Sequence, residues 1–211
     1  MIKVKGVSKE FDKHMVISNF NLTVKEGILL CLAGPSGVGK TTLLNIISLI
    51  ERPTKGSVEI DGVSKWKLSI IQKVRRLKIG YVFQNYGLIE NDTAKQNLLL
   101  TSKFVALSKQ RKQEAFVDAL LKVGLDEGYL ERKVYSLSGG EQQRLALARL
   151  FITKPKYIFA DEPTGNLDHE NAEIVFKQLE NFAKSGHTVI YVSHNEELIK
   201  RADKVIFLEK I

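Results

Sequence analysis

The sequence predicts an α/β fold with a mainly parallel sheet, an N-terminal antiparallel β subdomain and an inserted α-helical subdomain. Three observations lead to this prediction. Strand-like and helical segments alternate in the last third of the chain, as they do in parallel sheets covered by helices. The first 33 residues contain only strand-like segments, and the stretch from about residue 92 to 153 shows only helical spacing.

In the first part of the chain, the strand-like segments are rich in β-branched or apolar residues and are separated by polar turns. They are residues 2–7, 15–24, 28–33, 57–60 and 79–83. An apolar block of helical length at 41–49 follows a glycine loop. Strand, loop and helix therefore occur in the order that a phosphate-binding unit requires.

The remainder of the chain divides into a helical part and a returning α/β part. The helical segments of the first part are 93–101, 108–123 and 140–152. Strands return at 157–160, 188–192 and 205–208, with helices at 170–184 and 195–201. We therefore expect a single domain over 1–211, with a core and β subdomain at 1–90 and 155–211 and a helical subdomain at 91–154.

Composition places the chain among ordinary globular proteins. Its 211 residues suffice for one sizeable core. Hydrophobic residues make up 44% and charged residues 27%, which argues against disorder, collagen-like repeats and a disulfide scaffold. The net charge of +8 comes from bases scattered among acids, which indicates a solvated surface. We expect no nucleic-acid partner.

The single cysteine, Cys31, lies in an apolar run, so we expect a buried thiol and a reducing compartment. No apolar run approaches the roughly 20 residues of a membrane-spanning helix. The first residues lack the apolar core of a signal peptide. We therefore expect a cytoplasmic protein that contacts the inner face of the cell membrane only peripherally.

A phosphate loop follows the apolar strand at 28–33. Its glycines allow backbone N–H groups to approach the phosphates closely, and the helix that begins there directs its positive end at them. Lys40 would bridge the β- and γ-phosphates and the Thr41 hydroxyl would bind Mg²⁺. The alternative is an ordinary glycine-rich turn. The candidate nucleotide-binding residues are Gly34, Pro35, Ser36, Gly37, Val38, Gly39, Lys40, Thr41 and Thr42.

Two acids end the apolar strand at 157–160. Asp161 stands where a carboxylate can hold a Mg²⁺ ion, and Glu162 where one can accept a proton from an attacking water. Acids at this position could instead be ordinary capping or ion-pair residues. Their occurrence together with a phosphate loop favours the catalytic interpretation.

The stretch LSGGEQQR at 137–144 contains a second candidate anion site. Ser138, Gly139 and Gly140 lie at a predicted helix start, where backbone N–H groups can bind phosphate. One chain has only one γ-phosphate to bind, so this site would serve the nucleotide of a second copy, giving a dimer with two ATP at its interface. The alternative is a simple helix cap at Ser138, which would leave the second glycine unexplained.

On these motifs the sequence resembles the ABC ATPase family over essentially its whole length, with LSGGEQQR matching that family's signature. The resemblance implies a P-loop NTPase core of the RecA-like type and roles for five further residues. Gln84 resembles the glutamine that touches Mg²⁺ or water and reports to a membrane partner. Asp168, in the D-loop 166–168, would cross the dimer interface. His194 would contact the γ-phosphate, and Phe11 would stack on adenine beside Val16.

The segment at 161–168 and the small size resemble the exporter branch that contains the MacB, LolD and FtsE ATPases and the ATPases of bacteriocin or peptide export. Two residues differ from its usual pattern. Phe11 stands where tyrosine is commoner, which should preserve stacking. Gln96 stands where glutamate is usual, which changes the charge near the contact with a membrane subunit.

The sequence thus predicts an ATP-hydrolysing subunit of an ABC transporter, with ATP and Mg²⁺ as cofactors. The catalytic candidates are Glu162, His194, Gln84 and Lys40, and the metal candidates are Thr41, Gln84 and Asp161. The expected partners are a second copy and a separate membrane permease. The alternatives are an FtsE-like cell-division or mechanical ATPase without cargo, an ABC ATPase acting on DNA or ribosomes, and a small-molecule kinase.

Overall fold

The computed structural model describes residues 1–103, 105 and 108–210. It contains a three-stranded sheet in the order β2-β1-β4 and a five-stranded sheet in the order β5-β6-β7-β3-β8. The first sheet is antiparallel and the second is parallel throughout. Both predicted sheet types are therefore confirmed. Among the described residues, no helix combines the length and the apolar character needed to cross a membrane.

The elements follow one another in the expected order. The strands are β1 (Ile2–Phe11), β2 (His14–Val24), β3 (Leu29–Ala33), β4 (Lys55–Ile60), β5 (Ile79–Val82), β6 (Tyr157–Asp161), β7 (Thr188–Val192) and β8 (Lys204–Phe207). The α-helices are α1 (Lys40–Ile47), α2 (Leu68–Lys78), α3 (Ala94–Ser102), α4 (Lys109–Lys122), α5 (Gly139–Thr153), α6 (His169–Lys184) and α7 (Glu196–Lys200). Short 3₁₀ turns lie at Glu127–Glu131 and Val134–Ser136.

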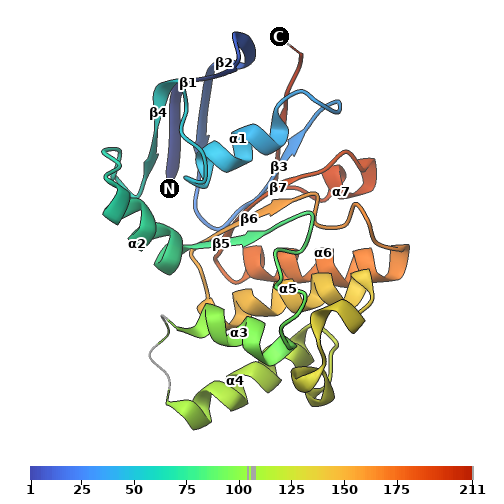
Figure 1. Cartoon of the computed structure of the whole chain (residues 1–211). Coiled ribbons are helices and arrows are strands. Elements are labelled where there is room, and N and C mark those ends of the chain that lie inside the picture. Colours follow the sequence, from blue (N-terminus) through green and yellow to red (C-terminus); the bar gives the residue numbers. More distant parts are fainter. Residues whose placement is uncertain (104, 106–107, 211) are drawn as a thin grey trace.

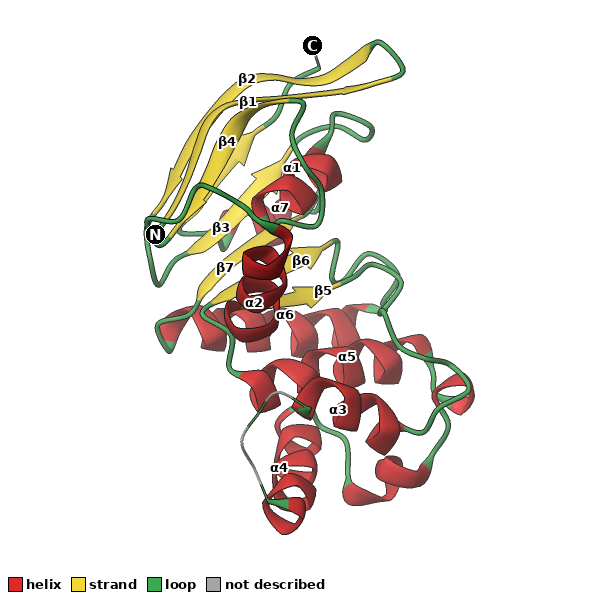
Figure 2. Ribbon diagram, turned by 60° about the vertical axis from the view of Figure 1, so that its left-hand side comes forward, coloured by secondary structure: helices red, strands yellow, loops and turns green. Residues whose placement is uncertain are grey.

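The elements form layers, which Figures 1 and 2 show from two sides. Helix α1 lies between the antiparallel sheet and one face of the parallel sheet. Helices α5 and α6 lie beneath the other face, and α3 and α4 extend the molecule further on that side. The helical segment between β5 and β6 is thus an insertion, as the sequence predicts.

The strands β6, β7 and β3 of the parallel sheet are buried on both faces, and their side chains alternate between two apolar clusters. In β3, Leu29, Cys31 and Ala33 belong to the cluster that includes α5 and α6. Leu30 and Leu32 belong to the cluster that includes α1 and the antiparallel sheet. Helices α1 and α5 therefore pack on opposite faces of the same sheet. Cys31 is buried as expected, and burial raises the pKa of its thiol to about 11.

Among the described residues, α2 is the one α-helix without a counterpart in the sequence predictions. Its sequence has four basic residues and no acid, and only Ile71 is buried. Leu68 and Leu77 are more than half exposed, so the apolar residues do not form a single buried stripe. No side chain caps its N-terminus. The apolar residues Leu68, Ile71, Val74 and Leu77 do recur at helical spacing, so the start signal is what this segment lacks.

A partly exposed charge network links the antiparallel sheet to the parallel one. Asp61, in the turn after β4, accepts hydrogen bonds from Lys78 Nζ (2.6 Å), Lys156 Nζ (2.8 Å) and the Tyr157 hydroxyl (2.5 Å). Burial on its own would raise the pKa of Asp61. The hydrogen bonds from the two lysines and the tyrosine outweigh burial and hold that pKa well below its ordinary value.

We predict that Asp61→Asn lowers the free energy of unfolding by about 2 kcal/mol at pH 7, because two charge-assisted hydrogen bonds are weakened. Asparagine tolerates the positive φ of this position (50°), so the turn itself should persist. A carboxylate with a depressed pKa stabilises above its unfolded pKa of about 4, and this contribution is lost as pH falls. The difference between wild type and variant should therefore shrink below pH 4 in urea titrations.

Asp118→Asn is the matched control, because Asp118 pairs with Lys122 on an exposed helix face. Such a pair contributes about 0.5 kcal/mol or less. An Asp61→Asn effect no larger than that of Asp118→Asn, or one that persists unchanged at pH 3, would contradict the assignment.

Candidate functional site

The loop between β3 and α1 has the backbone conformation that its glycines allow. Gly34, Gly37 and Gly39 all have positive φ, of 138°, 77° and 95°. A Cβ on Gly34 would lie 2.4 Å from the Leu208 carbonyl oxygen, and one on Gly39 would lie 2.8 Å from Val16 Cγ1. Side chains at these positions would be both strained and obstructed. The structure thus places Val16 next to this loop.

Lys40, the first residue of α1, is buried, and its ammonium group lies within the loop. Its Nζ donates to the carbonyl oxygens of Gly34 (2.9 Å) and Pro35 (2.7 Å). These neutral acceptors hold the cation beside the N-terminus of the helix. A phosphate would offer the same ammonium group charged acceptors, which form stronger hydrogen bonds than carbonyl oxygens do.

Thr41 and Asp161 meet at the carboxyl edge of the parallel sheet, where the Thr41 hydroxyl donates to Asp161 Oδ1 (2.9 Å). Burial, with a smaller contribution from the charge of Glu162, raises the pKa of Asp161 above its ordinary value, and the Thr41 bond partly offsets this. A divalent cation would also favour the ionised carboxylate.

This pair of oxygen ligands fits Mg²⁺, which is held in nucleotide sites by one or two protein oxygens together with substrate phosphates. Within the described residues there is no cluster of three or more His, Cys, Asp or Glu side chains that could hold a metal alone. The donor set therefore fits a metal that arrives with a nucleotide.

Glu162 and His194 lie side by side on the loops that follow β6 and β7. Glu162 Oε1 is 3.2 Å from His194 Nδ1, and the His194 side chain is 62% exposed. Glu162 has a φ of 42°, in the left-handed region that side chains rarely adopt. Such strain persists where the surroundings enforce it, and it is concentrated at functional sites. The structure thus brings together two of the predicted catalytic residues.

The sequence predicts that Gln84 ends a strand. In the structure β5 ends at Val82, and Gln84 lies in the turn that follows. It is exposed and lines a hollow of about 650 Å³. Asp161 and Asn166 line the same hollow, and so does Gln142 of α5. Gln84 therefore borders the candidate metal site on the side of the helical insertion.

Ser138 caps helix α5. Its hydroxyl accepts from Glu141 N (3.3 Å), and Glu141 Oε2 accepts from Ser138 N (2.7 Å), which completes a capping box. The capping alternative is thus present in the structure. Packing within the chain also explains why the second glycine is a glycine, because a Cβ on Gly140 would lie 2.6 Å from Asn171 Cγ. For Gly139, the corresponding neighbour is the Tyr86 hydroxyl at 2.8 Å.

The remaining predicted residues lie on exposed parts of the chain. Asp168 caps α6 by accepting from Asn171 N (2.8 Å). Phe11, at the tip of the β1–β2 hairpin, is 43% exposed, and Lys9 Nζ lies 4.6 Å from its ring centroid. Gln96 accepts at its side chain from Thr93 N (2.7 Å) in a second capping box. Its amide serves the helix start, which a glutamate could serve equally.

Two residues that the sequence analysis missed fix the segment after β5 to the helical insertion. Asn97 is fully buried, and its amide group bonds to the Ile89 backbone N–H (2.9 Å) and carbonyl (3.1 Å). Arg149 donates to Asn97 Oδ1 (2.9 Å) and to the Gly87 carbonyl oxygen (2.6 Å). Burial lowers the pKa of Arg149 to about 10. An asparagine and an arginine on helices carry no sequence signal for this contact, which depends on tertiary packing.

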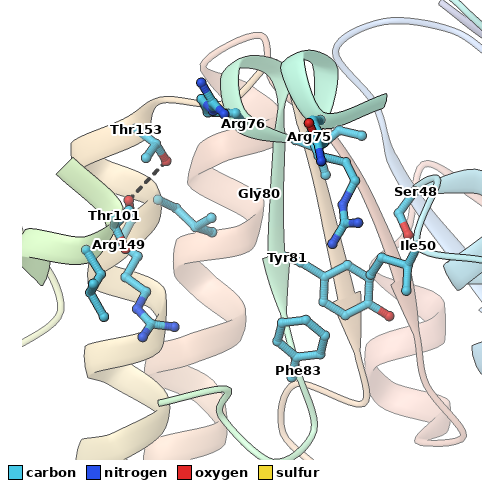
Figure 3. A pocket seen from close by; sticks show the side chains of 14 residues that line it. Ser48, Ile50, Arg75, Arg76, Gly80, Tyr81, Phe83, Thr101, Arg149 and Thr153 are labelled. Carbon is cyan, nitrogen blue, oxygen red and sulfur yellow. Dashed lines mark hydrogen bonds between the residues drawn. The ribbon is translucent and has the colours of Figure 1, made fainter. Parts of the chain in front are cut away.

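A groove of about 570 Å³ lies between α2, β5, α3 and α5 (Figure 3). Arg75, Arg76 and Arg149 line it, and none of its lining residues is an acid. Its apolar lining includes Phe83 and Leu100, each 38% exposed. Arg75 extends from α2 toward Tyr81 on the groove floor. The groove therefore combines positive charge with an accessible apolar surface.

The family model described as ABC transporter matches residues 17–165. This match covers well over half of the chain and includes the phosphate loop, Ser138–Gly140 and Glu162. The chain belongs to the ABC transporter family. The ABC assignment confirms the predicted family, and with it the ATPase activity.

Two ABC relatives illustrate the similarity. The lipoprotein-releasing system ATP-binding protein LolD of Bacteroides thetaiotaomicron is 36% identical, over 99% of this chain and 96% of that protein. The macrolide export ATP-binding/permease protein MacB of Campylobacter fetus is 34% identical, over 98% of this chain and 33% of that protein. The chain thus corresponds to one third of MacB and to nearly all of LolD.

Among solved structures, the ABC transporter cassette MJ0796 of Methanocaldococcus jannaschii matches with a TM-score of 0.91 and 36% identity, over 99% of this chain and 94% of that one. That structure is dimeric. A post-hydrolysis state of the same cassette, a dimer bound to ADP and Pi, matches with a TM-score of 0.89 and 34% identity. These matches confirm the α/β cassette fold and the assignment as an ATP-binding subunit of an ABC transporter.

Proposed function

We propose that two copies of this chain enclose two MgATP molecules and drive a separate membrane permease that exports its cargo. The observation that carries the proposal is the placement of α1 and α5 on opposite faces of the parallel sheet. The phosphate loop and Ser138 therefore stand at the starts of helices that the sheet separates. A second copy can bring its Ser138 to the nucleotide that the first copy holds, and the dimeric MJ0796 cassette supports this arrangement.

Within one copy, the phosphate loop would bind the nucleotide. The backbone N–H groups of the glycine loop and the N-terminus of α1 supply positive potential for the phosphates. Lys40, already directed into the loop, would exchange carbonyl acceptors for phosphate oxygens. Thr41 and Asp161 would hold Mg²⁺, which when bound neutralises charge on the terminal phosphates. Gln84 borders this position and would orient water near it.

Glu162 is the proposed general base for the attacking water. Its carboxylate lies next to Asp161 in the sequence, on a loop held in a strained conformation, and it contacts His194. His194, at the edge of the site, would touch the terminal phosphate and orient Glu162. The neighbouring Gly165 leaves room for the carboxylate, since a Cβ there would lie 3.3 Å from Glu162 Oε2.

Export and a separate permease are supported by the relatives. One is named for lipoprotein release, and the other for macrolide export by a chain with both ATP-binding and permease functions. The match with MacB covers one third of the length of MacB. By analogy with LolD, named as the ATP-binding protein of a lipoprotein-releasing system, we assign the membrane-spanning function to a permease subunit, which this subunit contacts at the inner face of the cell membrane.

We predict that Glu162→Gln lowers the ATP hydrolysis rate by at least about 100-fold, because general-base catalysis contributes 10²–10⁴-fold. ATP should still bind, since the amide keeps the size of the carboxylate, and the unhydrolysed nucleotide should hold the dimer together. Light scattering with saturating MgATP should therefore detect a dimer for the variant. Phosphate release measures the hydrolysis rate.

Glu114→Gln is the matched control, because Glu114 lies on the exposed face of α4, in the helical insertion. It should hydrolyse ATP at the wild-type rate. A Glu162→Gln variant that remains monomeric at saturating MgATP would refute the two-copy site.

We further predict that Phe11→Ala raises the dissociation constant for ATP about tenfold. Stacking of a base on an aromatic ring contributes about 1–3 kcal/mol by alanine substitution, and 1.4 kcal/mol is a factor of ten. Phe11→Tyr keeps the ring and should stay within about twofold of wild type. Titration with a fluorescent ATP analogue measures both. Equal affinities of the alanine and tyrosine variants would exclude Phe11 from the adenine site.

The groove of Figure 3 is the proposed docking site for the permease. Three arginines and no acid line the groove, so its positive charge favours binding of a segment with an acidic side chain. The Arg75 guanidinium has no ion-pair partner among the described residues, so it is available to such a group. The accessible Phe83 and Leu100 call for an apolar side chain beside the acid. We therefore assign the groove to a cytoplasmic segment of the permease that carries both.

We predict that Arg75→Glu reduces the amount of permease that co-purifies with this subunit at least about tenfold, because charge reversal replaces an attraction with a repulsion. The measurement is affinity purification from solubilised membranes of the native host, with mass spectrometry to quantify the polytopic membrane protein that accompanies the wild-type subunit. The affinity of the isolated subunit for ATP should be unchanged, because Arg75 lies on α2, away from the phosphate loop.

Lys73→Glu is the control, because Lys73 belongs to the same helix, is exposed and does not line the groove. It makes the same change in net charge outside the proposed contact. Equal losses for the two variants would mean that net charge, and not the groove, governs the association.

A further inference from the structure

Two segments of this chain, Ser138–Gly140 and the loop 166–168, would reach the nucleotide of the second copy under the proposed function. They are separated by 26 residues or more in the sequence and belong to the starts of α5 and α6. Each segment precedes or opens a helix, and the two helices pack against each other. The side chain that joins the two starts is Asn171.

The Asn171 side chain bonds to α5 and to the loop 166–168, and it lies against Gly140. Its Oδ1 accepts a hydrogen bond from Arg144 Nη1 on α5. Its Nδ2 donates to Asp168 Oδ2 (2.6 Å), in the loop before α6. The same amide group packs on Gly140, where a Cβ would lie within 2.6 Å of both Cγ and Oδ1. One amide thus spans the short distance between the two helix starts.

The side chain of Asn171 is not needed to cap α6. The cap is formed by its backbone N–H, which donates to Asp168 Oδ1 (2.8 Å). Replacement of the side chain leaves that bond in place. The amide contacts are therefore not required for the helix to form. Their effect is to fix the position of the two segments relative to each other.

A second hydrogen bond links α5 to the beginning of the segment that connects β6 to α6. Gln143, which is buried, donates from Nε2 to the Pro163 carbonyl oxygen (2.7 Å). Pro163 directly follows Glu162. The loop between β6 and α6 is therefore held to α5 near its beginning by Gln143 and near its end by Asn171.

We propose that Asn171 is a positioning residue that locks the loop 166–168 to the start of α5, so that both segments meet the second copy as one rigid surface. The inference rests on the proposed two-copy site. Without the amide, each segment would have to be ordered separately when the dimer forms, and that ordering costs free energy. Binding of nucleotide to a single copy would not involve this cost.

The experiment uses Glu162→Gln as the parent, so that hydrolysis does not limit the dimer. Asn171→Ala removes both amide contacts. Asn171→Asp keeps an oxygen that can accept from Arg144, removes the donor to Asp168 and places two carboxylates together. Lys177→Ala, an exposed residue on the same helix, is the matched control. Dimerisation with MgATP is measured by analytical ultracentrifugation, and single-copy affinity by titration with fluorescent ADP.

We expect both Asn171 variants to weaken dimerisation at least about tenfold, as the loss of a charge-assisted hydrogen bond would. Their ADP affinity should stay within about twofold of the parent, and Lys177→Ala should match the parent in both measurements. This split between dimerisation and single-copy affinity distinguishes positioning from general loss of structure.

Three outcomes would overturn the inference. If the parent dimerises and Asn171→Ala dimerises equally well, Asn171 has no positioning role. If ADP affinity falls in parallel with dimerisation, the residue supports the fold in general. If the parent itself does not dimerise, the two-copy site is wrong and the inference fails with it.

Discussion

The hydrogen bond between Thr41 and Asp161 joins two parts of the chain that are 120 residues apart. It forms because β3 and β6 belong to one parallel sheet, whose strands all end at the same edge. Thr41 follows the first of these strands and Asp161 ends the second. Every other feature of the site depends on this edge, because Lys40 precedes Thr41, Glu162 follows Asp161 and β7 leads to His194. The sheet thus fixes the spacing of groups that the sequence keeps apart.

The same edge is connected to the groove on the outside of the molecule. The Tyr81 hydroxyl donates to Asn45 Oδ1 (2.7 Å) on α1, and the Tyr81 ring stacks on Phe83 at 4.3 Å between centroids. Burial, and then the charge of Asp161, raises the pKa of Tyr81, which further favours the protonated hydroxyl that this bond requires. A segment seated on Phe83 would therefore be two contacts away from the helix that would hold the phosphates. The chain of contacts is short because α1 and β5 belong to the same apolar cluster or border it.

The sequence was sufficient for those parts of the fold and site that depend on local patterns. Strand periodicity, the phosphate loop and the acids at 161–162 all have signals within a few residues, and the structure places them together. Helix α2 was not predicted because no capping side chain marks its start and its apolar residues are divided between buried Ile71 and exposed Leu68 and Leu77. Asn97, Arg149 and Asn171 act through partners that lie 8 to 62 residues away or on other helices. Their identities alone give no indication of those partners.

Ser138 shows that a helix cap and a phosphate ligand need not be alternatives. A hydroxyl has one donor and two acceptor sites. The cap uses an acceptor site, because Ser138 Oγ accepts from Glu141 N, and the hydroxyl hydrogen stays free for a phosphate oxygen. Glu141 is restrained as well. Burial would raise its pKa, but hydrogen bonds from Tyr129 and Ser138 lower it, so its charge is held by donors of its own chain. The capping box therefore preorganises the helix start that the second copy's nucleotide would meet.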